Sequence, residues 1–212
     1  FTGFINDFVT YGTIQTNLGT IRSDLNMKLP AGQDPVYSGS IATDNFRLGE
    51  FLGDPSIGLV SMTGTVKGKG FSEKSRNTLV DGNIRFADFK GYRYNNIQVK
   101  GKLDKKLFDG TASINDNHLQ MDMSGLIDFN SKTPRFNLLA KVDKANLKDL
   151  NITRDSINFR GKLNFNFTSS SIDNFLGEAR ITEAEILKNG TPLPFDSLIV
   201  TSSFVDSVKT LS

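Results

Sequence analysis

The sequence predicts an all-β protein: an elongated, twisted antiparallel sheet that curls into an apolar trough and carries a few short helical turns. Three observations predict this fold. Apolar and polar residues alternate along most of the 212 residues, as in strands that pack one face. Hydrophobic residues make up only 37% of the chain although it contains 17 phenylalanines, which suits a single layer better than a thick two-sided core. Glycines also recur inside the apolar rows.

The predicted strands follow one another with short turns between them. The clearest hairpin spans 97–116 and turns at DKK (104–106). Four segments, 1–12, 45–54, 144–150 and 171–177, have the weaker pattern of a turn or two of helix. The strand rows are predicted at 21–29, 37–41, 60–66, 80–86, 97–103, 108–114, 119–129, 136–142, 157–167, 175–181 and 198–200.

Two stretches of the chain repeat each other. Residues 37–53 align with 136–152, 59–71 with 156–168, 81–89 with 176–184, and 94–103 with 195–204, at an offset of about 95–101 residues. We therefore interpret 1–212 as a single β-groove fragment with an internal repeat over roughly 37–103 and 136–204. Because the chain begins with Phe1 rather than Met, we expect it to be an excised piece of a longer protein.

Eight glycines lie on the apolar side of their strands, where side chains are expected to pack. Glycine inside a strand marks a sharp bend or a close approach by another backbone or a ligand. Such glycines in neighbouring strands would let the sheet fold along a crease, an interpretation preferred to relief of crowding inside an ordinary barrel or sandwich. The crease glycines are Gly39, Gly64, Gly82, Gly101, Gly110, Gly125, Gly161 and Gly177.

An apolar trough has to be filled, because burying apolar surface is worth about 25 cal/mol per Å² and the sequence offers no second layer to cover the trough. An acyl chain fits this description. The predicted lining consists of apolar side chains that lie on the same side of their strands as these glycines. These residues are Val60, Met62, Val66, Ile84, Phe86, Val99, Leu103, Ala112, Ile114, Met121, Met123, Ile127, Phe129, Phe136, Leu138, Phe159, Leu163 and Phe165.

Two stretches carry a resemblance to a known family. LGEARITEAEILKNGTPLPFDSL (176–198) and DGNIRFADFKGYRYNNIQVKGKL (81–103) share one cadence, a strand led by glycine, a turn and a return strand. This cadence resembles the C-terminal half of the translocation and assembly module subunit TamB family, within the AsmA-like repeating-β-groove superfamily. The Asn- and Lys-rich, Cys-free style is similar to members from Bacteroidetes. The resemblance covers nearly all 212 residues, and it lies in the spacing of strands, glycines and turns rather than in invariant residues.

The resemblance implies the periplasmic part of an inner-membrane-anchored protein, with the anchor outside this fragment. It implies a lipid conduit, or β-taco, that shields phospholipid acyl chains between the inner and outer membranes and is linked to outer-membrane protein assembly. The implied partner is an Omp85-type outer-membrane barrel (TamA-like), contacted through regions outside this fragment. The family offers no catalytic residues.

Other chemistry finds little support in the sequence. The charged residues are scattered along the chain and the net charge is only +2, so the sequence predicts no positive electrostatic potential that would attract nucleic acid. The absence of Cys excludes disulfides and thiolate chemistry. The single histidine, His118, is interpreted as a solvated turn residue. Asp104, Asp109 and Asp116 are interpreted as solvated acids rather than glycosidase carboxylates. VKGKGF (66–71) lacks the ending of a phosphate loop. We predict no enzyme, no cofactor and no metal.

Three function classes predict alternating strands. A lipid conduit is preferred, and the alternative is a structural or adhesive β-sandwich binding module with no lipid transport role. That sandwich would need its inward positions filled to native density, which the inward glycines oppose. An outer-membrane barrel ranks third, because Trp is absent and the Phe residues are not gathered into girdles. No apolar run approaches the roughly 20 residues of a membrane helix.

Overall fold

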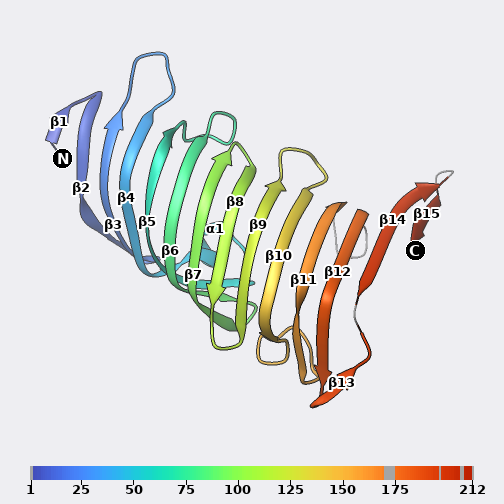
Figure 1. The fold of residues 1–212 in the computed structure, drawn as a ribbon. Coiled ribbons are helices and arrows are strands. Elements are labelled where there is room, and N and C mark those ends of the chain that lie inside the picture. The colour runs from blue at the N-terminus through green and yellow to red at the C-terminus, as the bar shows by residue number, and fades with distance from the viewer. Residues whose placement is uncertain (1, 170–174, 196, 206–207, 212) are drawn as a thin grey trace. The chain divides into compact units, whose positions relative to one another are not determined.

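The computed structural model describes residues 2–169, 175–195, 197–205 and 208–211. The chain divides into two compact units, Phe1–Lys105 and Lys106–Ser212. Nearly all regular structure in both is β-strand, and the only helix among the described residues, α1 (Leu48–Leu52), has five residues (Figure 1). The predicted all-β class is therefore confirmed.

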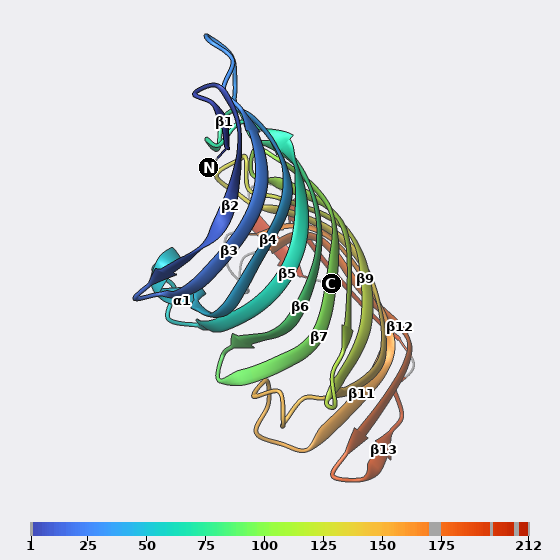
Figure 2. The ribbon, with the colours of Figure 1, turned by 90° about the vertical axis from the view of Figure 1, so that its left-hand side faces the viewer.

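The first unit is an antiparallel meander in which each strand pairs with the next one along the chain. Its strands bend along their length, so that the sheet is curved (Figure 2). Among the described residues of this unit, no pairing closes the first strand onto the last. The strands are β1 (Thr2–Phe4), β2 (Asp7–Thr16), β3 (Gly19–Lys28), β4 (Val36–Arg47), β5 (Ile57–Lys69), β6 (Asn77–Phe89) and β7 (Tyr92–Asp104).

The second unit repeats this antiparallel arrangement, with the short β13 paired to the end of β12 beside the main path. Its path of pairings is also open within the described residues. The strands are β8 (Leu107–Asn115), β9 (Leu119–Asp128), β10 (Arg135–Asn146), β11 (Ile157–Ser169), β12 (Phe175–Lys188), β13 (Thr191–Leu193), β14 (Leu198–Val205) and β15 (Val208–Leu211).

Each strand row predicted from the sequence coincides with a strand, but two of the four helical predictions, 1–12 and 144–150, are wrong. Residues 1–12 hold β1 and most of β2, because β3 offers this segment a complete hydrogen-bonded ladder. Segment 45–54 does contain α1, whereas 144–150 ends β10 and continues as a turn. Of segment 171–177, residues 171–174 lie outside the described residues and the remainder begins β12.

Strands β4, β6, β10 and β12 each carry a β-bulge that shifts the pairing by one residue, and β5 has another shift of this kind between Ile57 and Val60. Asn45 in β4 and Glu183 in β12 have φ angles of 47° and 51° at their bulges, and the extra residue of β6 is Arg85. A bulge bends its strand and increases the local twist. The four strands correspond in pairs in the predicted repeat, β4 with β10 and β6 with β12.

Among the described residues, neither unit places a second layer over its sheet. Within each unit the strands pack against their neighbours in the sheet, and α1 packs against β5. The sandwich alternative would bury one sheet face against another, and neither unit does so. The buried hydrophobic side chains among the described residues are few and scattered, namely Tyr37, Phe46, Val60, Phe86, Val142, Ala145, Leu150 and Ala184.

Candidate functional site: two apolar sheet faces

In the first unit, the predicted lining side chains form rows that cross β5, β6 and β7. Met62 pairs with Ile84, and Ile84 pairs in turn with Ile97. The residues between them in β5, such as Thr63 and Thr65, are exposed on the opposite face. We call this surface the apolar face of the first unit. Its predicted lining residues are Val60, which is buried, and Met62, Val66, Ile84, Val99 and Leu103, which are half-buried.

In the second unit, the rows cross β8 to β11. Ala112 pairs with Met123, Met123 with Ala140, and Ala140 with Leu163. The next row joins Ile114 to Met121. We call this surface the apolar face of the second unit. Its half-buried predicted lining residues are Ala112, Ile114, Met121, Met123, Ile127, Phe136, Leu138, Phe159, Leu163 and Phe165.

Aromatic rings gather at one end of the apolar face of the second unit. Phe136 lies 5.2 Å from Phe167, and Phe167 lies 5.9 Å from Phe165, between ring centroids. Phe129, directly after β9, lies 6.1 Å from Phe136 and is 50% exposed. Edge-to-face and tilted pairs at these spacings stabilise one another beyond simple burial. The cluster presents a rigid apolar surface that is still partly open to solvent among the described residues.

The neighbouring backbone gives a local reason for some of the glycines. Gly39 and Gly125 have φ angles of +147° and +138°, which residues with side chains rarely adopt. A Cβ atom at Gly39 would overlap the carbonyl oxygen of Asp24, and one at Gly125 would overlap that of Asn137. At these positions the adjacent strand lies where a side chain would be, which is the close backbone approach that the sequence suggested.

Two pairs of the predicted crease glycines face each other directly across neighbouring strands. Gly64 pairs with Gly82 in the first unit, and Gly110 pairs with Gly125 in the second. Each pair leaves a gap in the apolar row, because neither residue contributes a side chain. The predicted alignment of glycines between neighbouring strands is therefore present locally in both units.

Phe86 is the exception among the predicted lining residues of the first unit. Met62 pairs with Ile84, whereas its neighbour Ser61 pairs with Phe86. Since consecutive strand residues point to opposite faces, Phe86 and Ile84 lie on opposite faces of the sheet. There the guanidinium of Arg93 lies 3.9 Å from the centroid of the Phe86 ring. The predicted row is wrong at Phe86, because the one-residue bulge before it reverses the alternation.

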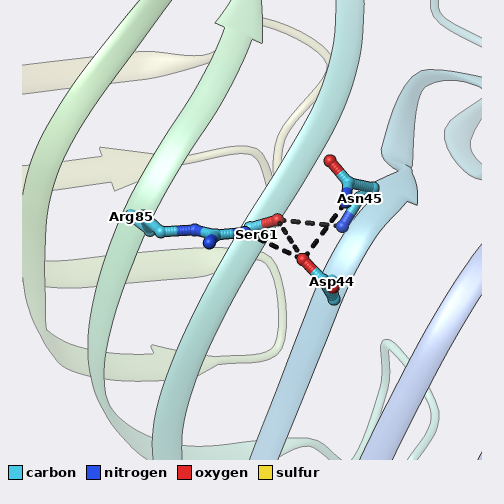
Figure 3. A network of polar contacts seen from close by, with 4 residues as sticks. All are labelled: Asp44, Asn45, Ser61 and Arg85. Carbon is cyan, nitrogen blue, oxygen red and sulfur yellow. Dashed lines mark hydrogen bonds and ion pairs between the residues drawn. The ribbon is translucent and has the colours of Figure 1, made fainter.

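A polar network ties the bulges of β4 and β6 together on this opposite face (Figure 3). The backbone N–H of Asn45 donates to Ser61 Oγ at 2.8 Å, and Ser61 Oγ donates to Asp44 Oδ1 at 3.2 Å. Arg85 Nη2 donates to the same carboxylate oxygen at 2.8 Å. Ser61 is only 2% exposed, so its hydroxyl satisfies an N–H that the bulge removes from the ladder. The network thereby fixes where the two strands bend.

Replacing Arg93 with Ala should lower the free energy of unfolding by about 1–2 kcal/mol. Arg93 Nε donates to Asp88 Oδ1 at 2.7 Å and Nη2 to Oδ2 at 2.9 Å, while its guanidinium covers the Phe86 ring. A half-exposed ion pair contributes up to about 1 kcal/mol, and a cation–π contact about 0.5–1 kcal/mol. Urea unfolding at neutral pH would measure the loss. Arg93→Lys keeps the charge but lacks the paired donors, so its free energy of unfolding should lie between those of wild type and Arg93→Ala.

The same pair predicts a pH dependence. The hydrogen bond from Arg93 holds the pKa of the Asp88 carboxyl below its ordinary value. A carboxylate with a lowered pKa in the folded state stabilises the fold above its ordinary pKa, and this contribution disappears as pH falls through the lowered pKa. The difference in stability between wild type and Arg93→Ala should therefore shrink in acid. An unchanged difference below about pH 3 would contradict this account.

The titratable residues singled out from the sequence are differently placed. His118 is half-buried, with Nδ1 2.9 Å from Asp149 Oδ2, so it is paired rather than simply solvated. Asp116 is 3% exposed and accepts the backbone N–H of His118 at 2.9 Å; closing the turn before β9 buries it, contrary to prediction. Asp104 is half-buried and accepts from Asn77 Nδ2 at 3.0 Å, whereas Asp109 is exposed.

The described part of the chain contains no group of three or more His, Asp or Glu side chains placed to hold a metal ion. Nor does it contain a helix with the length and apolar character needed to span a bilayer. No family model matches the chain, and neither does any curated protein or solved structure compared with it.

Proposed function

We propose that this chain is a segment of a lipid conduit that shields phospholipid acyl chains as they pass between the inner and outer membranes. The proposal rests on one observation: each unit is a curved single-layer sheet with an apolar face that no other described element of that unit covers. A soluble protein that leaves continuous apolar surface in this way generally presents a binding surface. The protein would act by shielding rather than by chemistry, so the proposal assigns no catalytic residue.

The energetics favour an acyl chain on these faces. The lining side chains are half-buried by their neighbours alone, so a ligand laid over them removes the remaining apolar area from water. Each methylene group buried contributes about 0.8 kcal/mol, and a long acyl chain adds many such increments without needing a polar partner. Methionines at positions 121 and 123 adapt to an irregular, mobile ligand better than branched side chains do.

The cellular setting of the proposal comes from the resemblance to the TamB family. It places the chain in the periplasm as part of an inner-membrane-anchored protein, with an Omp85-type barrel as partner and a link to outer-membrane protein assembly. These statements are part of the proposal and concern regions beyond the two apolar faces.

Native mass spectrometry of the expressed chain tests the conduit. We expect adducts with phospholipid masses that disappear after extraction with organic solvent and return on incubation with phospholipid vesicles. A chain that purifies free of lipid and gains no adduct after that incubation would contradict the proposal. The control is Lys67→Gln, which changes an exposed residue on the polar face of the first unit, the side of the sheet opposite its apolar face. This variant should carry the same adducts.

A further inference from the structure

The polar face of the first unit contains an open hollow over β2 to β5. Its volume is about 360 Å³, the size of a small-molecule site. The register sets two rows of side chains across it: Tyr11, Asp24 and Ser40 form one row. Thr13, Arg22, Ala42 and Thr63 form the other. The residues of these two rows that come from β4 and β5, namely Ser40, Ala42 and Thr63, have short side chains that fill little of the space above the sheet.

Two opposite charges in this hollow have no partner. Cross-strand ion pairs occur elsewhere on the polar face, including Lys28 with Asp7 at 3.1 Å in the same hairpin and Lys100 with Asp81 at 3.3 Å. Within the described residues, by contrast, the side chains of Arg22 and Asp24 make no hydrogen bond or ion pair. They face Thr13 and Tyr11 instead of opposite charges, and both are exposed.

We propose that this hollow binds a short zwitterion, with a carboxylate on Arg22 and an ammonium group on Asp24. Residues two apart in a strand lie roughly 7 Å apart on one face, and the ends of an extended dipeptide are separated by up to about 7 Å. Arg presents parallel N–H donors that match a carboxylate. The cation end has a second attraction, because Tyr11, the cross-strand partner of Asp24, is 81% exposed and offers its ring to an ammonium group.

The site is independent of the proposed conduit. Arg22 and Asp24 alternate along β3 with Ile21, Ser23 and Leu25, so they point away from the apolar side of that strand. A zwitterion bound here would neither need nor displace an acyl chain. The two ideas can therefore fail separately.

Titration of the isotope-labelled chain with glycylglycine, followed by amide NMR shifts, tests the site. We expect saturable shifts concentrated on β2, β3 and β4 at the hollow. Blocking either end of the ligand, as N-acetylglycylglycine or glycylglycine amide, should weaken binding at least threefold, in line with exposed ion pairs. Asp24→Asn should remove the penalty of acetylation, and Arg22→Gln the penalty of amidation.

The controls separate this site from general surface binding. Lys67 lies on the same polar face outside the hollow, so Lys67→Gln should leave unchanged the loss of affinity caused by acetylation and the loss caused by amidation. Both tested residues are exposed, so their variants should keep a dispersed spectrum. Shifts spread over the surface, no shifts up to the solubility of the dipeptide, or equal binding of blocked and free dipeptides would each overturn the proposal.

Discussion

Acyl-chain binding should fall at least tenfold when Met121 is replaced by Asp, while the fold survives. Met121 is half-buried between Ile114 and Val142 on the apolar face of the second unit. In the free protein a carboxylate at this position still reaches water, so folding loses little. Under a bound acyl chain it would be buried without a partner, at a cost of several kcal/mol, and each 1.4 kcal/mol corresponds to a tenfold change in Kd. Displacement of a fluorescent fatty acid would measure it.

The neighbouring residue provides the matched control. Gln120 precedes Met121 in β9 and is exposed on the opposite face, so Gln120→Asp adds the same charge to the same strand outside the proposed ligand path. Its binding should match wild type. Phe159→Asp, in β11, offers a second variant on the apolar face, with thermal melts confirming that each protein folds. Equal binding by the Met121 and Gln120 variants would count against the conduit.

Replacing Gly39 with Ala should lower the free energy of unfolding by at least about 1–3 kcal/mol. The φ of +147° at Gly39 is strained for any residue with a side chain. The new Cβ would also overlap the carbonyl oxygen of Asp24 and lie 3.0 Å from the Cα of Leu25. These are backbone atoms held in the β3–β4 ladder, so relief requires the two strands to separate locally. Urea unfolding followed by circular dichroism would measure the loss.

Gly82 is the control within the same unit. A Cβ there would meet nothing closer than the carbonyl oxygen of Thr63 at 3.8 Å. Gly82→Ala should leave stability unchanged or raise it by up to about 1 kcal/mol, because it restricts the unfolded chain. If the two variants lose stability equally, the close backbone approach at Gly39 is not the reason for its glycine.

The strands were predictable because their apolar rows obey a two-residue period, as Leu119, Met121 and Met123 do in β9. Strand β2 was missed, since its pattern around Tyr11 and Ile14 leaves both side chains largely exposed. Exposure on that scale removes the contrast between faces on which the period depends. Pairing with β3 decided the structure of this segment, and that pairing is a long-range contact.

The bulges could not be predicted from the alternation, and they explain the error at Phe86. A one-residue insertion is invisible in sequence until the partner strand is known, because either Arg85 or its neighbours could be the extra residue. Asn45 gave the one usable signal, since Asn tolerates left-handed backbone better than most residues. Glu183 gave none. The unpaired charges Arg22 and Asp24 were also missed, because pairing across strands requires the register.

The scarcity of fully buried apolar side chains has a calorimetric consequence. The heat capacity increment of unfolding reports newly hydrated apolar area, and close-packed domains show about 12–15 cal/mol/K per residue. Both units already keep much of their apolar face in contact with water when folded. Their increment per residue should therefore fall below that range, which flattens the curve of stability against temperature. The free energy of unfolding of such a sheet would therefore change little between cold and moderately warm conditions. For a protein with a dry interior, the same curve would show a pronounced maximum.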